Sequence, residues 1–228
     1  MNEPTLFDMD WPCLGTDESG KGDYFGPLVV AGVCLDEGAA QALSGLGVMD
    51  CKRLTDRRVA ELAGKIREVC GPKRFAEVEL TPETYNRLYE DMKREGKNLN
   101  ALLAWGHVQA IESVLKQSIC HQIIADKFGD ERLIRSRLKA ALPDRRLNLI
   151  QRPRAEAHPA VAAASVLARA RFLAWMGRAS EAYGMTLPKG ATTVKEAARG
   201  FVEKHGPDAL RKVAKLHFRT TQEVLRRG

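Results

Sequence analysis

Two apolar segments near the start of the chain, joined by a glycine-rich turn, constrain the fold most. Residues 14–17 and 27–35 both have the length of a strand, and the core of the second, Leu28-Val29-Val30-Ala31-Gly32-Val33, is a compact apolar run. Further strands are predicted near residues 75–80, 120–125 and 147–151. A chain that makes strands early and helices later, with at least one strand–helix–strand crossover, is typical of an α/β fold with a mixed sheet.

Helical patterns fill most of the remaining chain. Thr55 or Asp56 is the expected N-cap of the first helix, and Thr81-Pro82 has the cap-then-proline signature of another helix start. Small residues dominate the first half of the segment 160–182, which lets a neighbouring backbone approach closely. The predicted helices cover residues 54–69, 82 onward, 99–117, 131–141, 160–182, 194–204 and 208–214.

Charge favours a polyanionic partner. The 228 residues contain 36 Lys and Arg against 29 Asp and Glu, a net charge of +7, and the pI is about 9.3. The excess is uneven, because residues 189–228 hold ten Lys or Arg and four Asp or Glu, a net +6. Aromatic residues make up only 6% of the chain, which argues against a single-strand binder built from many stacking platforms.

Other features exclude broad classes of protein. The five cysteines are scattered without a C-x-x-C pair, which argues against a disulfide framework and against structural zinc. No apolar run approaches the roughly 18 residues of a membrane span. Residues 1–10 are acidic and lack the apolar core of a signal peptide. We therefore expect a cytoplasmic protein with reduced thiols and no membrane partner.

The densest local motif is Gly15-Thr-Asp-Glu-Ser-Gly-Lys-Gly22. It satisfies the phosphate-loop pattern except at Gly22, where a Ser or Thr should hold magnesium, and its two acids would repel phosphates. Adjacent acids usually mark a solvated turn. Here Asp17 and Glu18 directly follow a predicted strand and precede glycines, so they are candidates for holding a hard cation, while the loop N–H groups can meet a phosphate.

Two more acids follow predicted strands. Asp126 comes after Ile123-Ile124-Ala125, where the simpler interpretation is the start of a turn. Glu156 precedes a helix, where an acid commonly complements the helix dipole. Taken together, strand-end carboxylates from distant parts of one sheet are how a metal cluster for phosphoryl chemistry is assembled.

The motif that runs from Gly15 through Asp23-Tyr-Phe-Gly-Pro27 closely resembles the opening motif of the type 2 ribonucleases H, and its G-K-G form is similar to ribonuclease HIII. Further stretches match the family in order over nearly the whole chain. These are Asp50-Cys-Lys52 with Leu54-Thr55, Asn100 to His107, Ala162 to Arg169, Leu187-Pro-Lys-Gly190, and Lys215-Leu-His-Phe218.

The resemblance implies a ribonuclease H fold, a mixed five-stranded sheet flanked by helices, with a helical C-terminal extension. It implies an endonuclease that hydrolyses the RNA strand of RNA–DNA hybrids with two ions, Mg²⁺ or Mn²⁺, and leaves 5′-phosphate and 3′-hydroxyl ends. The implied metal-binding and catalytic residues are Asp17, Glu18, Asp126 and Glu156. Substrate contacts are implied for Gly20, Lys21, Gly22 and Lys52.

Two departures from the family bear on the subtype. Only fourteen residues precede Gly15, whereas ribonuclease HIII proteins usually carry an N-terminal substrate-binding domain, so we expect that domain to be absent and the basic C-terminal stretch to supply more of the binding. Cys51 stands where Ser is usual, and a thiol is a weaker donor. Two alternatives stay open: ribonuclease HII–like cleavage at single embedded ribonucleotides, and a hybrid-binding protein without catalysis.

The remaining expectations concern organisation and single residues. We expect a short extension at 1–13, a catalytic domain at 14–185 and a basic helical segment at 186–228 packed on it. His107 is predicted to be a packed core residue and His158 to begin a helix with Pro159. Lys215 to Phe218 either contacts nucleic acid or anchors the tail. Residues 3–7, Glu-Pro-Thr-Leu-Phe, faintly resemble the peptides that bind the bacterial sliding clamp.

Overall fold

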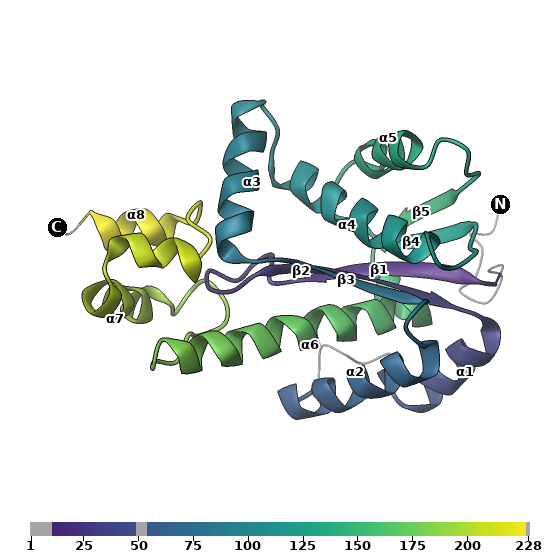
Figure 1. Ribbon diagram of the computed structural model, residues 1–228, viewed down its shortest axis with the longest axis horizontal. Helices are drawn as coiled ribbons and strands as arrows, with labels where there is room; N and C mark the ends of the chain where they lie inside the picture. The colour runs from purple at the N-terminus through teal and green to yellow at the C-terminus, as the bar shows by residue number, and fades with distance from the viewer. Residues whose placement is uncertain (1–10, 49–53, 227–228) are drawn as a thin grey trace. The chain divides into compact units, whose positions relative to one another are not determined.

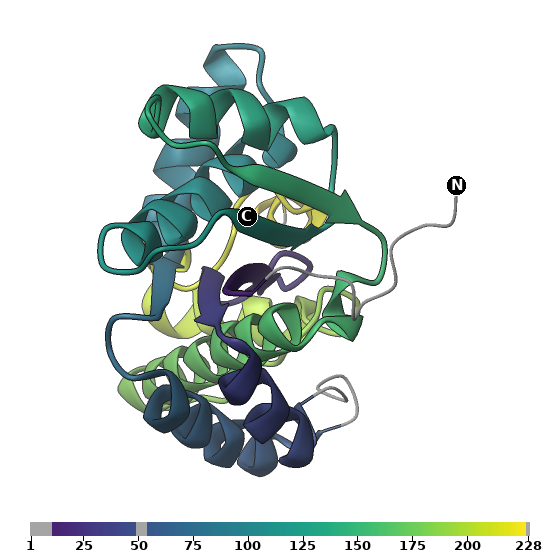
Figure 2. The same cartoon turned by 90° about the vertical axis from the view of Figure 1, so that its right-hand side faces the viewer.

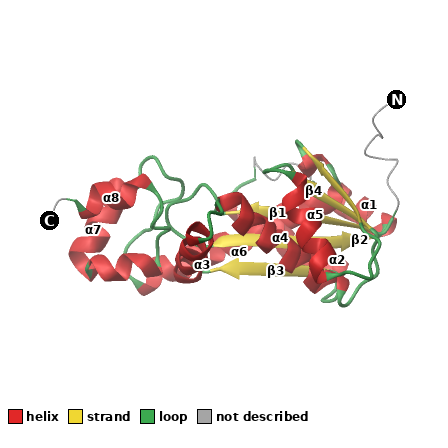
Figure 3. Ribbon diagram, turned by 90° about the horizontal axis from the view of Figure 1, so that it is seen from above, coloured by secondary structure: helices red, strands yellow, loops and turns green. Residues whose placement is uncertain are grey.

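A computed structural model describes residues 11–48 and 54–226. Five strands form one sheet in the order β3-β2-β1-β4-β5, in which β1 pairs in parallel with β4 and β4 with β5. Figure 3 shows β2 running opposite to β1 and β3, so the sheet is mixed as predicted. The strands are β1 (Cys13–Ser19), β2 (Leu28–Leu35), β3 (Phe75–Leu80), β4 (Gln122–Asp126) and β5 (Asn148–Arg152).

Burial along the strands shows where the sheet meets solvent. All eight residues of β2 are buried. In β1 the first four residues are buried, whereas Asp17, Glu18 and Ser19 are only partly buried. In β4 four buried residues likewise precede a partly buried Asp126. The two strands that carry the candidate acids therefore leave the core at their carboxyl ends.

The chain forms two compact units. The first consists of Met1–Glu18, Val30–Val78 and Leu99–Ala170. Within it, α4 and α5 lie on one side of the strands and α1 and α2 on the other (Figures 1 and 2). Its helices are α1 (Glu37–Gly45), α2 (Asp56–Cys70), α4 (Leu99–Leu115), α5 (Glu131–Ala141), the 3₁₀ turn η2 (Ala155–Ala157) and the start of α6 (Pro159–Ala182).

The predicted close approach of α6 is present at Gly15. A Cβ atom on Gly15 would lie 2.3 Å from the Ala160 carbonyl carbon and from the Val161 nitrogen, so no side chain fits there. The alanines at the start of α6 are fully buried, which lets the helix backbone rest directly on β1. This contact fixes the position of β1 two residues before Asp17, the first of its two acids.

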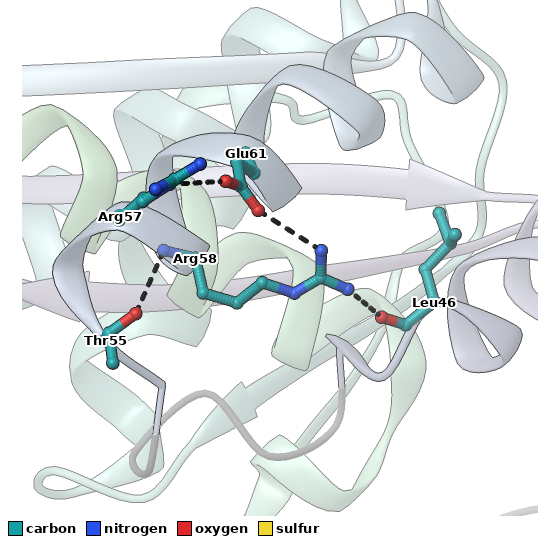
Figure 4. Close-up of polar contacts among 5 residues, drawn as sticks. All are labelled: Leu46, Thr55, Arg57, Arg58 and Glu61. Atoms are coloured by element: carbon teal, nitrogen blue, oxygen red, sulfur yellow. Dashed lines mark hydrogen bonds and ion pairs between the residues drawn. The ribbon is translucent and has the colours of Figure 1, made fainter.

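The start of α2 confirms the predicted cap. Thr55 accepts a hydrogen bond from the Arg58 backbone N–H (3.2 Å), which satisfies one of the free donors of the first turn (Figure 4). The Arg58 side chain contacts Glu61 and donates to the carbonyl of Leu46 (3.1 Å). Arg58 therefore joins the two ends of the segment 49–53, which lies outside the described residues.

The second unit consists of Ser19–Val29, Glu79–Asn98 and Arg171–Gly228. Its elements are the end of α6, α3 (Pro82–Arg94), α7 (Lys195–His205), the 3₁₀ helix η3 (Pro207–Lys212) and α8 (Arg219–Leu225). The helical stretch predicted near 208–214 is present as a short 3₁₀ helix that follows Gly206 and ends at Lys212. The sequence analysis missed α1 and α8.

Buried residues also test two exclusions drawn from composition. Cys13, Cys34, Cys70 and Cys120 are free and buried, as expected of reduced thiols, and Cys51 lies outside the described residues. The expectation that no apolar run approaches the length of a membrane span is wrong, because helix α6 has that length and apolar composition, with a mean hydropathy of 1.2 over its most apolar 18 residues. However, 56% of that stretch is buried inside the protein, as in the core helices of many proteins that cross no membrane.

Candidate active site

Asp17 and Glu18 form a crowded acidic pair at the carboxyl end of β1. The Asp17 Oδ1 atom accepts a hydrogen bond from the Glu18 N–H (2.9 Å), and the Glu18 side chain is only 13% exposed. Desolvation and the negative charge of Glu18 raise the pKa of Asp17 to about 7, against the opposing effect of a hydrogen bond with Ser165. Both carboxylates are therefore ionised at neutral pH only at a cost in free energy, which a nearby cation would offset.

The sheet register places Asp126 next to this pair. Thr16 of β1 is the partner of Ala125 of β4, and the residues that follow these partners are Asp17 and Asp126. Parallel strands lie about 4.8 Å apart, so the two backbones end side by side. The Asp126 Oδ1 atom accepts a hydrogen bond from the Ala155 N–H (3.3 Å), which links β4 to the turn that carries Glu156.

Glu156 lies in η2, between β5 and α6, and is partly buried. The turn begins at Arg154, whose φ of 59° is left-handed and costly for a residue other than glycine. The predicted position of Glu156 just ahead of a helix is confirmed, since α6 begins at Pro159 after His158. The strand register thus places Asp17 and Glu18 beside Asp126. The hydrogen bond from Ala155 to Asp126 brings in the turn that contains Glu156, the residue after Ala155.

His107 is a residue of this site that the sequence analysis missed. The prediction that it is a buried core residue is confirmed, because its exposed fraction is 0%. However, its Nε2 atom lies 3.2 Å from Glu18 Oε2 and its Nδ1 atom 2.9 Å from Thr16 Oγ1. The ring also stacks on Phe128 at 4.7 Å between centroids. His107 therefore fixes one carboxylate of the acidic pair from helix α4.

The donor set fits a hard divalent cation in its chemistry. Carboxylate oxygens are the ligands that Mg²⁺ prefers in proteins, and burial together with the charge of Glu18 raises the pKa of Asp17 at this edge. Among the residues that the structure describes, no group of three or more His, Cys, Asp or Glu side chains is arranged to hold a metal ion. The strand register and the hydrogen bond from Ala155 bring the backbones of the predicted ligands together. The assignment of all four acids to a metal stays a prediction.

In the second unit, two glycines of the loop after β1 differ in what they do. Gly20 has a φ of +87°, and a Cβ atom there would lie 2.1 Å from the carbonyl oxygen of Pro27, so folding itself requires glycine. Gly22 has no positive φ, and a Cβ atom there would meet nothing within 4 Å. The fold does not require glycine at position 22, and its exposed backbone is open to an outside molecule.

The C-terminal region holds this loop in place. The Lys215 side chain is fully buried, and its Nζ atom donates to the carbonyls of Asp23 (2.8 Å) and Gly26 (2.7 Å). Burial lowers the pKa of Lys215 to about 7. Of the two interpretations of Lys215, the structure supports the buried anchor. The resemblance of residues 215–218 to a family element did not indicate that Lys215 bonds to the carbonyls of Asp23 and Gly26.

Backbone contacts add to this anchoring. The Tyr24 N–H donates to Gly190 O (2.8 Å), and the Gly190 N–H donates to the Asp23 carboxylate (2.6 Å). The Gly26 N–H donates to Val213 O (2.8 Å). The predicted C-terminal element 187–190 thus supports the loop that contains Gly20, Lys21 and Gly22. Lys52, the other predicted substrate contact, lies outside the described residues.

Comparison with known proteins identifies the family. Residues 14–221 match the family described as Ribonuclease HII. The chain belongs to the ribonuclease HII family. It is 41% identical over 215 residues to Ribonuclease HIII of Protochlamydia amoebophila, an alignment that covers 94% of this chain and 68% of the relative. The enzyme class is therefore type 2 ribonuclease H, a class of metal-dependent endonucleases, and its similarity is to the HIII group.

Solved structures of this family share the fold. The crystal structure of Bst-RNase HIII in complex with Mn²⁺ has a TM-score of 0.82 and 33% sequence identity, covering 94% of this chain and 69% of that one. The RNase HII from Archaeoglobus fulgidus, solved as a complex with PCNA, has a TM-score of 0.68 and 32% identity over 85% of this chain and 88% of that one. The predicted ribonuclease H-like fold is confirmed.

Proposed function

We propose that this ribonuclease H hydrolyses the RNA strand of RNA–DNA hybrids, with a preference for runs of ribonucleotides. The proposal combines the similarity to proteins named Ribonuclease HIII with one observation at the site. That observation is the acidic pair Asp17-Glu18, which ends beside Asp126 in the sheet and in which the pKa of Asp17 is raised to about 7. A buried carboxylate beside a second carboxylate is unfavourable for a purely structural edge and useful for one that binds a cation.

The ligands in this proposal are Asp17, Glu18, Asp126 and Glu156, and the cofactor is Mg²⁺ or Mn²⁺, of which Mn²⁺ is present in a related crystal structure. Two such ions, when bound, supply the charge that activates a water and stabilises the leaving 3′ oxygen, so the products carry 5′-phosphate and 3′-hydroxyl ends. The chain's own contribution is positioning. His107 orients Glu18, and the Ala155 N–H orients Asp126.

The glycine loop supplies the substrate contacts in this proposal. Gly22 is exposed, and its lack of a side chain serves no contact inside the protein. A backbone N–H there can approach a phosphate or a ribose 2′-hydroxyl closely. Gly20 and Lys215 then act as supports that keep the loop in one conformation. Lys21 and Lys52 are proposed to contact the phosphate backbone, and the net charge of +7 supports salt-sensitive binding.

The test is cleavage of two end-labelled duplexes, with Mg²⁺ and separately with Mn²⁺. One duplex carries a single ribonucleotide in DNA, and the other carries a run of four or more. We expect the run to be cut, and EDTA to stop the reaction. Efficient cutting at the single ribonucleotide would instead assign the HII-like specificity that the family name suggests. No cutting of either duplex with either metal would contradict the nuclease function and favour a hybrid-binding protein.

A contact with a sliding clamp through residues 3–7 is a further part of the proposal. These residues lie outside the described part of the chain. The support is the solved complex of RNase HII with PCNA from Archaeoglobus fulgidus, together with the faint motif in this sequence. Deletion of residues 1–10 should remove clamp binding in a pull-down while cleavage of a short hybrid is unchanged. A cytoplasmic location is also proposed, because the cysteines are scattered and residues 1–10 lack the apolar core of a signal peptide.

A further inference from the structure

A basic pocket lies in the first unit where α5 and the start of β5 meet the segment that joins them. We call it the α5–β5 pocket. Its volume is about 340 Å³, and its wall combines cationic and apolar side chains. The cationic ones are Arg135, Lys139, Arg145 and Arg146.

The cations of this pocket fall into two kinds. Arg135 pairs with Glu131 and donates to the Leu149 carbonyl (3.2 Å), and Arg145 donates to the Leu115 carbonyl (3.0 Å), so both are fixed by the protein. Lys139 and Arg146 are exposed and make no hydrogen bond or ion pair with the other residues that the structure describes. The rim therefore carries two positive charges whose partners are left to an outside molecule.

The floor of the pocket is apolar. Leu138 and Leu149 are each only 4% exposed and belong to the core, and the partly buried Leu142 and Leu147 pack against the same core. The pocket thus combines the partly buried side chains of Leu142 and Leu147 with the cationic side chains of its wall. A ligand that fits both parts needs negative charge and at least one bulky apolar group.

The position of the pocket separates it from the candidate metal site. Gln122 pairs with Asn148 at the start of β5, whereas Asp126 pairs with Arg152 at its end. Four residues of strand span about 13 Å, so the pocket lies at the opposite end of the strand from the acids. A phosphate backbone would use the cations and leave the apolar floor uncovered. An acidic peptide with an apolar side chain would use both.

We propose that the α5–β5 pocket docks an acidic peptide segment of a partner protein, with one or two bulky apolar side chains of that peptide on the leucine floor. Lys139 and Arg146 pair with carboxylates of the peptide, and Arg135 and Arg145 hold the walls. The charge complementarity also predicts that binding weakens as salt concentration rises.

The test uses the full chain and a fluorescein-labelled peptide of five aspartates followed by leucine and phenylalanine. Fluorescence anisotropy should show saturable binding at 50 mM salt. The same peptide with its two apolar residues replaced by glycine should bind at least about tenfold more weakly. The double variant K139E/R146E should also bind the original peptide at least about tenfold more weakly, because like charges then face each other.

The matched control is R57E/K73E, which changes the net charge by the same amount at exposed positions on and beyond α2. It should bind the peptide as the wild type does, and thermal unfolding should show that both variants are folded. Equal loss in the control would mean that only net charge matters. A wild type that fails to bind the peptide overturns the proposal. So does a K139E/R146E variant that loses RNA–DNA hybrid binding but not peptide binding, since the pocket would then be a nucleic-acid contact.

Discussion

Two ionisable groups, one in each compact unit, have a pKa near 7 because burial shifts their pKa values in opposite directions. The pKa of Asp17 rises from 3.8 to about 7, and the pKa of Lys215 falls from 10.5 to about 7. The charge of Asp17 is disfavoured first by burial and then by the negative charge of Glu18, and the hydrogen bonds from Ser165 and the Glu18 N–H offset these effects only in part. The charge of Lys215 meets two carbonyl oxygens at hydrogen-bond distance.

The difference separates a site from a support. A like-charged pair gains stability when a cation arrives from outside, so its strain points to a ligand. Burial disfavours the charge of Lys215, but its amino group has two carbonyl partners within the fold and therefore stabilises a particular loop conformation. Burial of a charged group therefore has a functional meaning at the end of β1 and a structural one at the Asp23–Gly26 turn.

The largest expected effect comes from neutralising the neighbour of the pair. Asp126→Asn should lower kcat on a hybrid at least about 10³-fold, because a neutral amide holds a divalent ion poorly. Thermal stability and hybrid affinity should stay near wild type. Asp144→Asn, an exposed acid on the segment before β5, is the matched control and should keep full activity. An active Asp126→Asn variant would contradict a catalytic role for the carboxyl ends of β1 and β4. The raised pKa of Asp17 would then have no functional explanation.

The next test measures the strain at Asp17 itself. The native carboxyl binds its proton up to about pH 7 and the unfolded one only up to 3.8, so the native state binds more protons in this window and the free energy of unfolding falls as pH rises. Asp17→Asn lacks this loss. Between pH 5 and pH 8, its stability relative to wild type should increase by about 2 kcal/mol.

Urea denaturation in EDTA at several pH values gives this difference. The effect should level off above pH 7, where the native carboxyl is ionised. Asp17→Asn should also be inactive, so a variant that is more stable and yet inactive is the signature of a strained functional group. A stability difference that does not change with pH would show that Asp17 is not desolvated in the folded chain.

Lys215 should give the opposite sign in a different window. The native ammonium loses its proton near pH 7 and the unfolded one near 10.5, so the unfolded state binds more protons in between and the free energy of unfolding rises with pH. Relative to Lys215→Met, wild type should gain about 2 kcal/mol between pH 7 and pH 9. The nearby ionisable groups Asp23, Tyr85 and His217 are present in both chains, and although the charge of Lys215 lowers the pKa of His217, that pKa of about 4 lies below this pH window. A gain below pH 7 instead would contradict the buried anchor.

Most of the fold was predictable because its signals are local. Strand 75–80 and helix 131–141 have the predicted bounds, and Thr55 caps α2 as expected. The helix α1 was missed because its sequence, capped by Asp36, is rich in glycine and alanine and has a weak apolar pattern. The acids were found for the same local reason, since each of Asp17, Glu18 and Asp126 ends an apolar strand.

The supports of the site could not be predicted, because their partners are remote in the sequence. His107 is 89 residues from Glu18 and lies in an apolar helix, where a single histidine gives no sign of its contacts. Lys215 is 192 residues from Asp23. Only the fold brings these pairs together, so local patterns found the candidate reactive groups and missed the residues that orient them.

The smallest expected effect tests such an orienting residue. His107→Phe keeps a ring that can stack on Phe128 but removes the nitrogen that contacts Glu18 Oε2 at 3.2 Å. Loss of a partner that orients a metal-binding carboxylate typically lowers metal affinity or activity about tenfold or more. We expect the Mg²⁺ concentration for half-maximal cleavage to rise about tenfold, with a smaller change in the rate at saturating Mg²⁺.

Thr16→Val separates orientation from packing in this test. It removes the hydroxyl that lies 2.9 Å from His107 Nδ1 and leaves both the imidazole and Glu18 in place. Its effect on the Mg²⁺ requirement should have the same direction and be smaller than that of His107→Phe. If His107→Phe lowers the melting temperature but leaves the Mg²⁺ titration unchanged, His107 is only a core residue. The acidic pair would then lack support from α4, and the contrast with the firmly held loop at Lys215 would become sharper.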